Sequence, residues 1–241
     1  MNKSKSNILV ITEGVTDKEL TERLLKVYGI DEKFAFFSYG TNLYPLFNSI
    51  SKEQDRDDWD ILLFLRSREK DTKIQEILSF HFAEVIMIFD FDPHDPQFDA
   101  DKITMLVEFF SDSTGAGKLY INYPMVESFY HMKSIPDDVF NSYVVAVSDI
   151  GSFKARVQKD FQPDPRKFAI HKEDVDVVIR QNINKAQLIS DISIHSENKP
   201  PDSLRILVAQ LEKVNDERAV AVLCTSIFYI TDYNSNLIGM R

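Results

Sequence analysis

Hydrophobic residues in the first half of the chain gather in short runs, separated by segments with helical spacing. A continuous apolar run of a few residues, bounded by turn residues, is typical of a strand that is buried on both faces. The runs that predict strands are residues 7–12, 34–39, 84–90 and 118–122.

The segments between these runs predict helices. Leu20, Leu24 and Leu25 share one face of a helix expected over residues 16–27, with Thr16 as its N-cap and Glu19 completing a capping box. Further helices are expected over residues 43–50, 72–82 and 102–110, and residues 59–66, whose apolar centre fits either structure, are also interpreted as a helix. Strands that alternate with helices indicate a parallel α/β sheet flanked by helices.

The strand signal fades beyond Asp137, and the rest of the chain predicts mainly helices with a loop at residues 197–201. We therefore divide the chain into an α/β domain at residues 1–136 and a mainly helical C-terminal extension at residues 137–241. The boundary is expected near residues 136–150, and the two parts can share a core.

Composition narrows the class of protein. The chain has 241 residues, of which 44% are hydrophobic and 27% charged, as in soluble globular proteins. No apolar run approaches the roughly 20 residues needed to cross a bilayer, so we expect a cytoplasmic location and no membrane contact. The single cysteine, Cys224, excludes an internal disulfide. The net charge of -10 argues against a stand-alone, high-affinity nucleic-acid binder.

Acidic residues follow two of the predicted strands. Glu13 comes directly after the first run, Asp90 ends the run at residues 84–90, and Asp92 follows it by two residues. Ligand sites in parallel sheets lie beyond the carboxyl ends of the strands, and alternation along extended backbone would point Asp90 and Asp92 to the same side. Carboxylates are the ligands that Mg²⁺ prefers, so these three residues predict a site for Mg²⁺ or Mn²⁺. The alternative is that they cap helices or lie in solvated turns.

Two motifs resemble those of the TOPRIM superfamily. Residues 8–17, an apolar strand followed by Glu13-Gly14 and a helix, resemble its first motif, and Phe89-Asp90-Phe91-Asp92 resembles its second. The resemblance covers roughly residues 7–135 and implies a TOPRIM-like fold. It also implies that Glu13 is a general acid/base or a metal ligand and that Asp90 and Asp92 are metal ligands.

A third segment, residues 122–129, resembles the Asn-Pro-x-x-Glu element of TOPRIM nucleases in phage defence, some of which work with an ABC-type ATPase. Tyr123 interrupts the Asn-Pro pair in this chain. The resemblance adds Glu127 to the metal ligands and suggests an ATPase partner. From the residues alone, Pro124 fits the first turn of a helix, and Glu127 fits equally well a helix start favoured by the helix dipole.

Three further residues are accessory candidates. Asp17 lies one helical turn past Glu13, where some nuclease relatives place another acid, although charge at a helix start explains it more simply. Asp95 could contact a second metal ion through water, or could be a solvated loop residue. Lys118 is the third; the segment that contains it is no phosphate-binding loop, because Leu119 follows where a hydroxyl should be.

The function that these features predict is Mg²⁺- or Mn²⁺-dependent hydrolysis of phosphodiester bonds in DNA or RNA, in a phage-defence effector. A basic stretch within residues 154–185, which includes Lys154 and Arg166, could follow a phosphate backbone or could be an ordinary solvated helix face. One alternative is a non-catalytic TOPRIM-like subunit that regulates or contacts a partner such as an ATPase. A phosphatase that uses Asp90 as a nucleophile fits less well, because it leaves Glu13 without a role.

Overall fold

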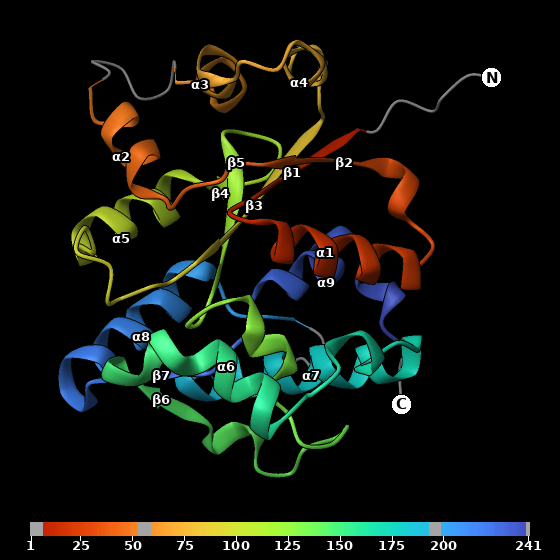
Figure 1. Ribbon diagram of the computed structural model, residues 1–241, viewed down its shortest axis with the longest axis vertical. Coiled ribbons are helices and arrows are strands. Elements are labelled where there is room, and N and C mark those ends of the chain that lie inside the picture. Colours follow the sequence, from red (N-terminus) through yellow and green to blue (C-terminus); the bar gives the residue numbers. More distant parts are fainter. Residues whose placement is uncertain (1–6, 53–58, 193–198, 240–241) are drawn as a thin grey trace.

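The computed structural model describes residues 7–52, 59–192 and 199–239, and a five-stranded sheet forms its centre (Figure 1). The strand order is β2-β1-β3-β5-β4, with β1, β2, β3 and β5 parallel and β4 antiparallel at one edge. The bounds are β1 (Ile8–Thr12), β2 (Phe34–Ser38), β3 (Glu84–Asp90), β4 (Ser111–Asp112) and β5 (Gly117–Asn122). The parallel α/β sheet predicted from the sequence is confirmed, and the two-residue β4 is an addition to it.

The register of the sheet brings three strand ends together. Thr12 of β1 lies opposite Ile88 of β3, and Asp90 of β3 lies opposite Asn122 of β5. The residues that follow β1, β3 and β5 therefore meet at one edge, which we call the carboxyl edge of the sheet. This edge is where ligands bind in open parallel sheets.

Helices connect the strands of the first part. They are α1 (Val15–Val27), α2 (Tyr44–Ile50), α3 (Ile61–Arg68), α4 (Thr72–Leu78) and α5 (Ala100–Phe109). The helical interpretation of the ambiguous segment at residues 59–66 is confirmed by α3, whereas α4 ends four residues earlier than the expected Phe82.

The start of α1 differs from the prediction. Gly14 is the N-cap, and its backbone N–H donates to the Asp17 carboxylate at 3.2 Å, so Thr16 lies inside the helix and the capping role predicted for it is wrong. The helix therefore begins two residues after Glu13, which fixes Glu13 and Asp17 on the same short segment.

The helix predicted at Pro124 is also wrong. Residues Val126–Tyr130 form only a short 3-10 helix, η3. Tyr123 exchanges two backbone hydrogen bonds of 2.8 Å with Leu223, and the Pro124 carbonyl accepts from the N–H of Phe91. These contacts hold Tyr123 and Pro124 in an extended path, and the backbone is still extended at Met125, so no α-helix begins at Pro124.

The second part of the chain contains α6 (Ile150–Asp160), α7 (Lys172–Ile189), α8 (Ser203–Glu217) and α9 (Tyr229–Asn234). Two short strands that the sequence did not predict, β6 (Val144–Ala146) and β7 (Ala219–Ala221), pair antiparallel. In Figure 1, α6, α7, α8 and this small sheet lie together in the lower half of the view.

A single hydrophobic core joins the two parts. It includes Leu9 and Phe89 of the large sheet together with Val178 of α7 and Leu207 of α8, all fully buried. Helix α8 contacts both α5 and β5. The second part therefore packs directly on the α/β part, and this packing positions α6 beside η3.

None of the helices described is long and apolar enough to pass through a lipid bilayer.

Candidate functional site

Glu13 lies across the ends of two strands. Its backbone N–H donates to the carbonyl of Ile88 at 3.0 Å, and its Oε2 accepts from the N–H of Asp90 at 3.1 Å. The pKa of Glu13 is raised from 4.5 to about 7, chiefly by burial and also by the carboxylates of Asp17, Asp92 and Asp95, against the lowering effect of the Asp90 N–H. Glu13 thus carries a proton part of the time near neutral pH.

Asp90 is the last residue of β3 and lies partly exposed at the carboxyl edge. Its Oδ1 accepts from the N–H of Val126 at 3.0 Å, so η3 holds the carboxylate in place. Burial raises the pKa of Asp90 well above its ordinary value, with additional repulsion from Asp17, Glu13 and Glu127. Four carboxylates from three parts of the chain therefore interact at this point.

Asp17 belongs to the same group. It is only 4% exposed, and its Oδ1 is buried without a hydrogen-bond partner while Oδ2 accepts from Gly14. Burial raises the pKa of Asp17 to about 6, and Glu127 adds to the effect. Its cap contact at the start of α1 explains one oxygen but not the other, which is available to a cation or a proton.

Glu127 completes the group through η3. It is 6% exposed, and its Oε1 forms an ion pair of 2.7 Å with Nζ of Lys154 in α6. The hydrogen bond to Glu127 raises the pKa of Lys154, and Asp90 and Asp17 act on it in the same direction. We call Glu13, Asp17, Asp90 and Glu127 the acidic cluster.

Lys154 is the residue of this site that sequence reasoning missed. It was one of several basic residues in a stretch interpreted as either a phosphate-binding track or a solvated face. Nothing in its local sequence distinguishes it from those neighbours, because only the packing of α6 on η3 brings it to Glu127.

Asp92 and Asp95 lie on the Glu13 side of the cluster. Strand β3 ends at Asp90, and Asp92 has a φ of 40°, so the alternation expected to align Asp92 with Asp90 does not extend to it. Asp92 pairs with Nδ1 of His94 at 2.6 Å, and Asp95 accepts from the Asn42 amide at 3.1 Å. Burial raises the pKa of Asp92, partly opposed by His94. These two acids therefore raise the pKa of Glu13 from a loop that is held in place by its own contacts.

Lys118 is not part of the site, contrary to its selection as an accessory residue. It lies at the start of β5, whereas Asn122 at the end of that strand is opposite Asp90. Its ammonium pairs with Asp232, and the hydroxyl of Tyr120 donates to the same carboxylate at 2.6 Å. Lys118 thus belongs to the opposite edge of the sheet.

The acidic cluster suits a hard divalent cation in its donor chemistry. All its side-chain donors are carboxylate oxygens, and one buried oxygen of Asp17 has no partner. Within the described ranges, no group of three or more His, Cys, Asp and Glu residues is arranged to hold a metal ion. Mg²⁺ commonly takes one or two carboxylates and completes its shell with water and substrate oxygens. The cluster fits that mode of binding better than a closed protein cage.

Comparison of the chain with protein-family models, with curated proteins and with solved structures found no significant match.

Proposed function

We propose that this protein is a metal-dependent nuclease that hydrolyses phosphodiester bonds in DNA or RNA through a TOPRIM-type acidic site. The observation that carries the proposal is the gathering of four carboxylates, those of Glu13, Asp17, Asp90 and Glu127, at the carboxyl edge of a parallel sheet. Like charges that raise one another's pKa in a buried site are characteristic of metal and catalytic centres.

Asp90 and Glu13 are the residues that would hold Mg²⁺ or Mn²⁺, with Asp17 and Glu127 completing the negative charge. When bound, such an ion activates a water molecule and stabilises the charge that develops on phosphorus and on the leaving oxygen.

The chain itself fixes the two principal carboxylates. The N–H of Asp90 orients Glu13, and the N–H of Val126 orients Asp90. Each bond holds a carboxylate on a different strand end, so the pair is prearranged by backbone rather than by mobile side chains. Prearranged groups lower the reorganisation required during a reaction.

Glu13 would act either as a ligand of the ion or as the group that exchanges a proton, because a carboxylate bound to a divalent cation stays ionised. A general acid or base works best when its pKa lies near the working pH, and the pKa of Glu13 is about 7. Its place at the strand end agrees with the acid/base role that the resemblance implies. Asp92 and Asp95 lie on the Glu13 side of the cluster, and their negative charges would add to the attraction between the site and the metal ion.

The test is cleavage of labelled single-stranded DNA, duplex DNA and tRNA by the purified chain with Mg²⁺ or Mn²⁺. A Glu13→Ala, Asp90→Ala double variant serves as the inactive control, and an Asp232→Asn variant, altered at the opposite edge of the sheet, serves as the matched control. We expect cleavage by the parent and by Asp232→Asn, and none by the double variant. Equal cleavage by all three would show that a contaminant is responsible.

The net charge of -10 favours a second function, that of a non-catalytic subunit which binds a partner such as an ATPase. An acidic surface repels polynucleotides and leaves their capture to the partner. In that case the chain alone cleaves nothing with either metal ion, and cleavage or ATPase activity changes only when the partner is added.

A further inference from the structure

A pocket of about 280 Å³ adjoins the acidic cluster. It lies between α1, η3, α6 and the segment at Pro165 and Arg166, and both Glu127 and Lys154 line it. A molecule in this pocket would therefore touch the ion pair at the margin of the cluster. Three cations, Arg23, Lys154 and Arg166, face two acids in the lining, although the whole chain carries a net charge of -10.

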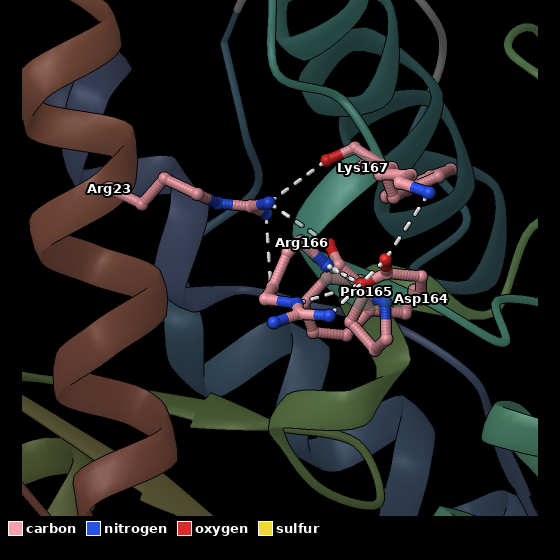
Figure 2. A network of polar contacts seen from close by, with 7 residues as sticks. Arg23, Asp164, Pro165, Arg166 and Lys167 are labelled. Carbon is pink, nitrogen blue, oxygen red and sulfur yellow. Dashed lines mark hydrogen bonds and ion pairs between the residues drawn. The ribbon is translucent and has the colours of Figure 1, made fainter.

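Arg23 forms a fixed wall of this pocket. Its Nη1 donates to the carbonyls of Pro165 and Phe168 at 3.1 and 3.0 Å, and its guanidinium lies 5.6 Å from the centre of the Tyr130 ring. Figure 2 shows Arg23 reaching from α1 to the segment that carries Asp164, Pro165, Arg166 and Lys167. Through these hydrogen bonds Arg23 joins α1 to this segment. The contact holds the two walls of the pocket together.

Lys154 and Arg166 are the cations able to meet a ligand. The side chain of Lys154 is 54% exposed, while that of its partner Glu127 is 8% exposed. Its ammonium has three donors and no acceptor, so it can contact an anion while keeping or releasing Glu127. Arg166 is 90% exposed and pairs with Asp164 at 2.9 Å, an exposed contact that water and salt weaken.

We infer that this pocket is the subsite for a phosphate of the substrate strand next to the bond that is cleaved, with Lys154 as its principal contact and Arg166 as a second. The inference rests on the proposed function, because it makes the ligand a polynucleotide. The charge pattern of the pocket explains how a strongly acidic chain can bind a polynucleotide. The cations lie beside the acidic cluster and attract the phosphate backbone of the polynucleotide towards it. Glu127 then holds Lys154 in place when no strand is bound.

The ion pair itself provides the test, because Lys154→Ala removes its positive charge and Glu127→Gln removes its negative charge. If the pair only supports the fold, both variants weaken the protein and change DNA binding in the same direction. If Lys154 binds phosphate, they act in opposite directions. Removing the ammonium lowers the affinity roughly tenfold, as the loss of one hydrogen bond to a charged group does. Removing the competing carboxylate raises it, because Lys154 is then no longer neutralised.

The experiment measures binding of a labelled single-stranded DNA oligonucleotide by fluorescence anisotropy in EDTA, so that neither cleavage nor a metal ion enters the result. Lys154→Arg should retain most of the affinity. Arg205→Ala, in a pocket lined also by Lys118 at the other end of β5, should leave it unchanged. The slope of log K against log salt should fall by about 0.7 in Lys154→Ala, the value for one phosphate contact on a single strand. Thermal unfolding of each variant checks that it is folded.

Opposite effects of Lys154→Ala and Glu127→Gln, with Arg205→Ala unchanged, support the inference. Parallel effects of the first two, a loss in Arg205→Ala but not in Lys154→Ala, or no binding by any of the proteins would overturn it. Cleavage assays on the parent decide the proposed function separately. A chain that binds as expected but never cleaves keeps the subsite and loses the nuclease, whereas a chain that cleaves but shows parallel effects keeps the nuclease and loses the subsite.

Discussion

The parallel strands of the large sheet end at the carboxyl edge and begin at the opposite side, which we call the amino edge. These two edges place charged side chains in opposite ways. At the amino edge, Lys118 and the hydroxyl of Tyr120 both contact Asp232, so a negative charge meets a positive one and a donor. At the carboxyl edge, the acidic cluster brings four carboxylates together, and Lys154 reaches only Glu127 among them through an ion pair. Opposite charges are paired at the first edge, whereas like charges gather at the second.

This difference indicates where the chain carries function. Buried like charges cost stability unless they are protonated or bind a cation. The amino edge shows that the same sheet can pair its charges where nothing else is required of them. The carboxyl edge gathers carboxylates at the place where parallel sheets bind ligands, and this gathering is the basis of the proposed cation site.

The largest expected effect separates the two edges by activity. Asp90→Asn removes a negatively charged metal ligand but keeps the shape of the side chain. We therefore expect the rate of cleavage to fall roughly 10³-fold, the equivalent of about 4 kcal/mol in the activation barrier. Asp232→Asn makes the same chemical change at the amino edge and should leave cleavage unaffected. Initial rates on the preferred polynucleotide, at saturating metal ion, give the comparison. Similar losses in both variants would remove the distinction between the edges.

A metal ion should stabilise the protein more at high pH than at low pH. The cluster must lose protons to bind a cation, and the pKa values of Glu13 and Asp17 are about 7 and about 6. With Mg²⁺ at about 100 times its dissociation constant, the free energy of unfolding should rise by about 2.7 kcal/mol at pH 8. At pH 6 the gain should be smaller. Thermal unfolding with and without Mg²⁺ at both pH values tests this; an equal gain at both would place the ion elsewhere.

Without metal, the stability of the folded chain should fall as the pH rises from about 5 to 8. Folding raises the pKa of Glu13 from 4.5 to about 7, so protonation of this residue favours the folded state and the contribution disappears above pH 7. Glu13→Gln keeps an acceptor for the Asp90 N–H and removes the charge. At pH 8 its melting temperature should exceed that of the parent by about 2–4 °C, the effect of about 1 kcal/mol in a protein of this size. At pH 5 the two should coincide, and a variant that is less stable at pH 8 would contradict the account.

The smallest effect is expected at the amino edge. Tyr120→Phe removes the hydrogen bond to Asp232 and leaves the buried ring in place, so the free energy of unfolding should fall by about 1 kcal/mol. Cleavage should not change, and the loss of stability should be the same at pH 6 and pH 8. Denaturant unfolding measures the first, and the cleavage assay the second. A loss of stability that differs between pH 6 and pH 8 would mean that the contacts of Asp232 do not keep the charge at this edge constant.

Glu13 and Asp90 could be found from the sequence because their positions depend on strand assignment alone. Glu13 directly follows β1 and Asp90 is the last residue of β3, and parallel pairing of these buried strands is enough to bring their ends together. The same reasoning failed for Asp92, because alternation holds only on extended backbone and the chain turns at that residue, with a φ of 40°.

The resemblance to TOPRIM nucleases named Glu127 as a metal ligand, whereas the residues alone left it equally well at a helix start. Its position, like that of Lys154, depends on tertiary structure. Glu127 joins the cluster because Tyr123 pairs with Leu223, a contact between residues far apart in the chain that fixes the path into η3. Lys154 is placed by the packing of α6 against η3. The strands β6 and β7 were missed for a related reason: with three residues each, they are too short to show a periodic pattern.

The central claim, that the carboxyl edge binds a divalent cation through the acidic cluster, is tested most directly by titrating the metal-free protein with Mn²⁺ in a calorimeter at pH 8. The parent and Asp232→Asn should bind Mn²⁺ with the same affinity, and Asp90→Asn should bind it at least about tenfold more weakly, because it loses a charged donor. Equal binding by all three proteins, or none by the parent, would contradict the claim.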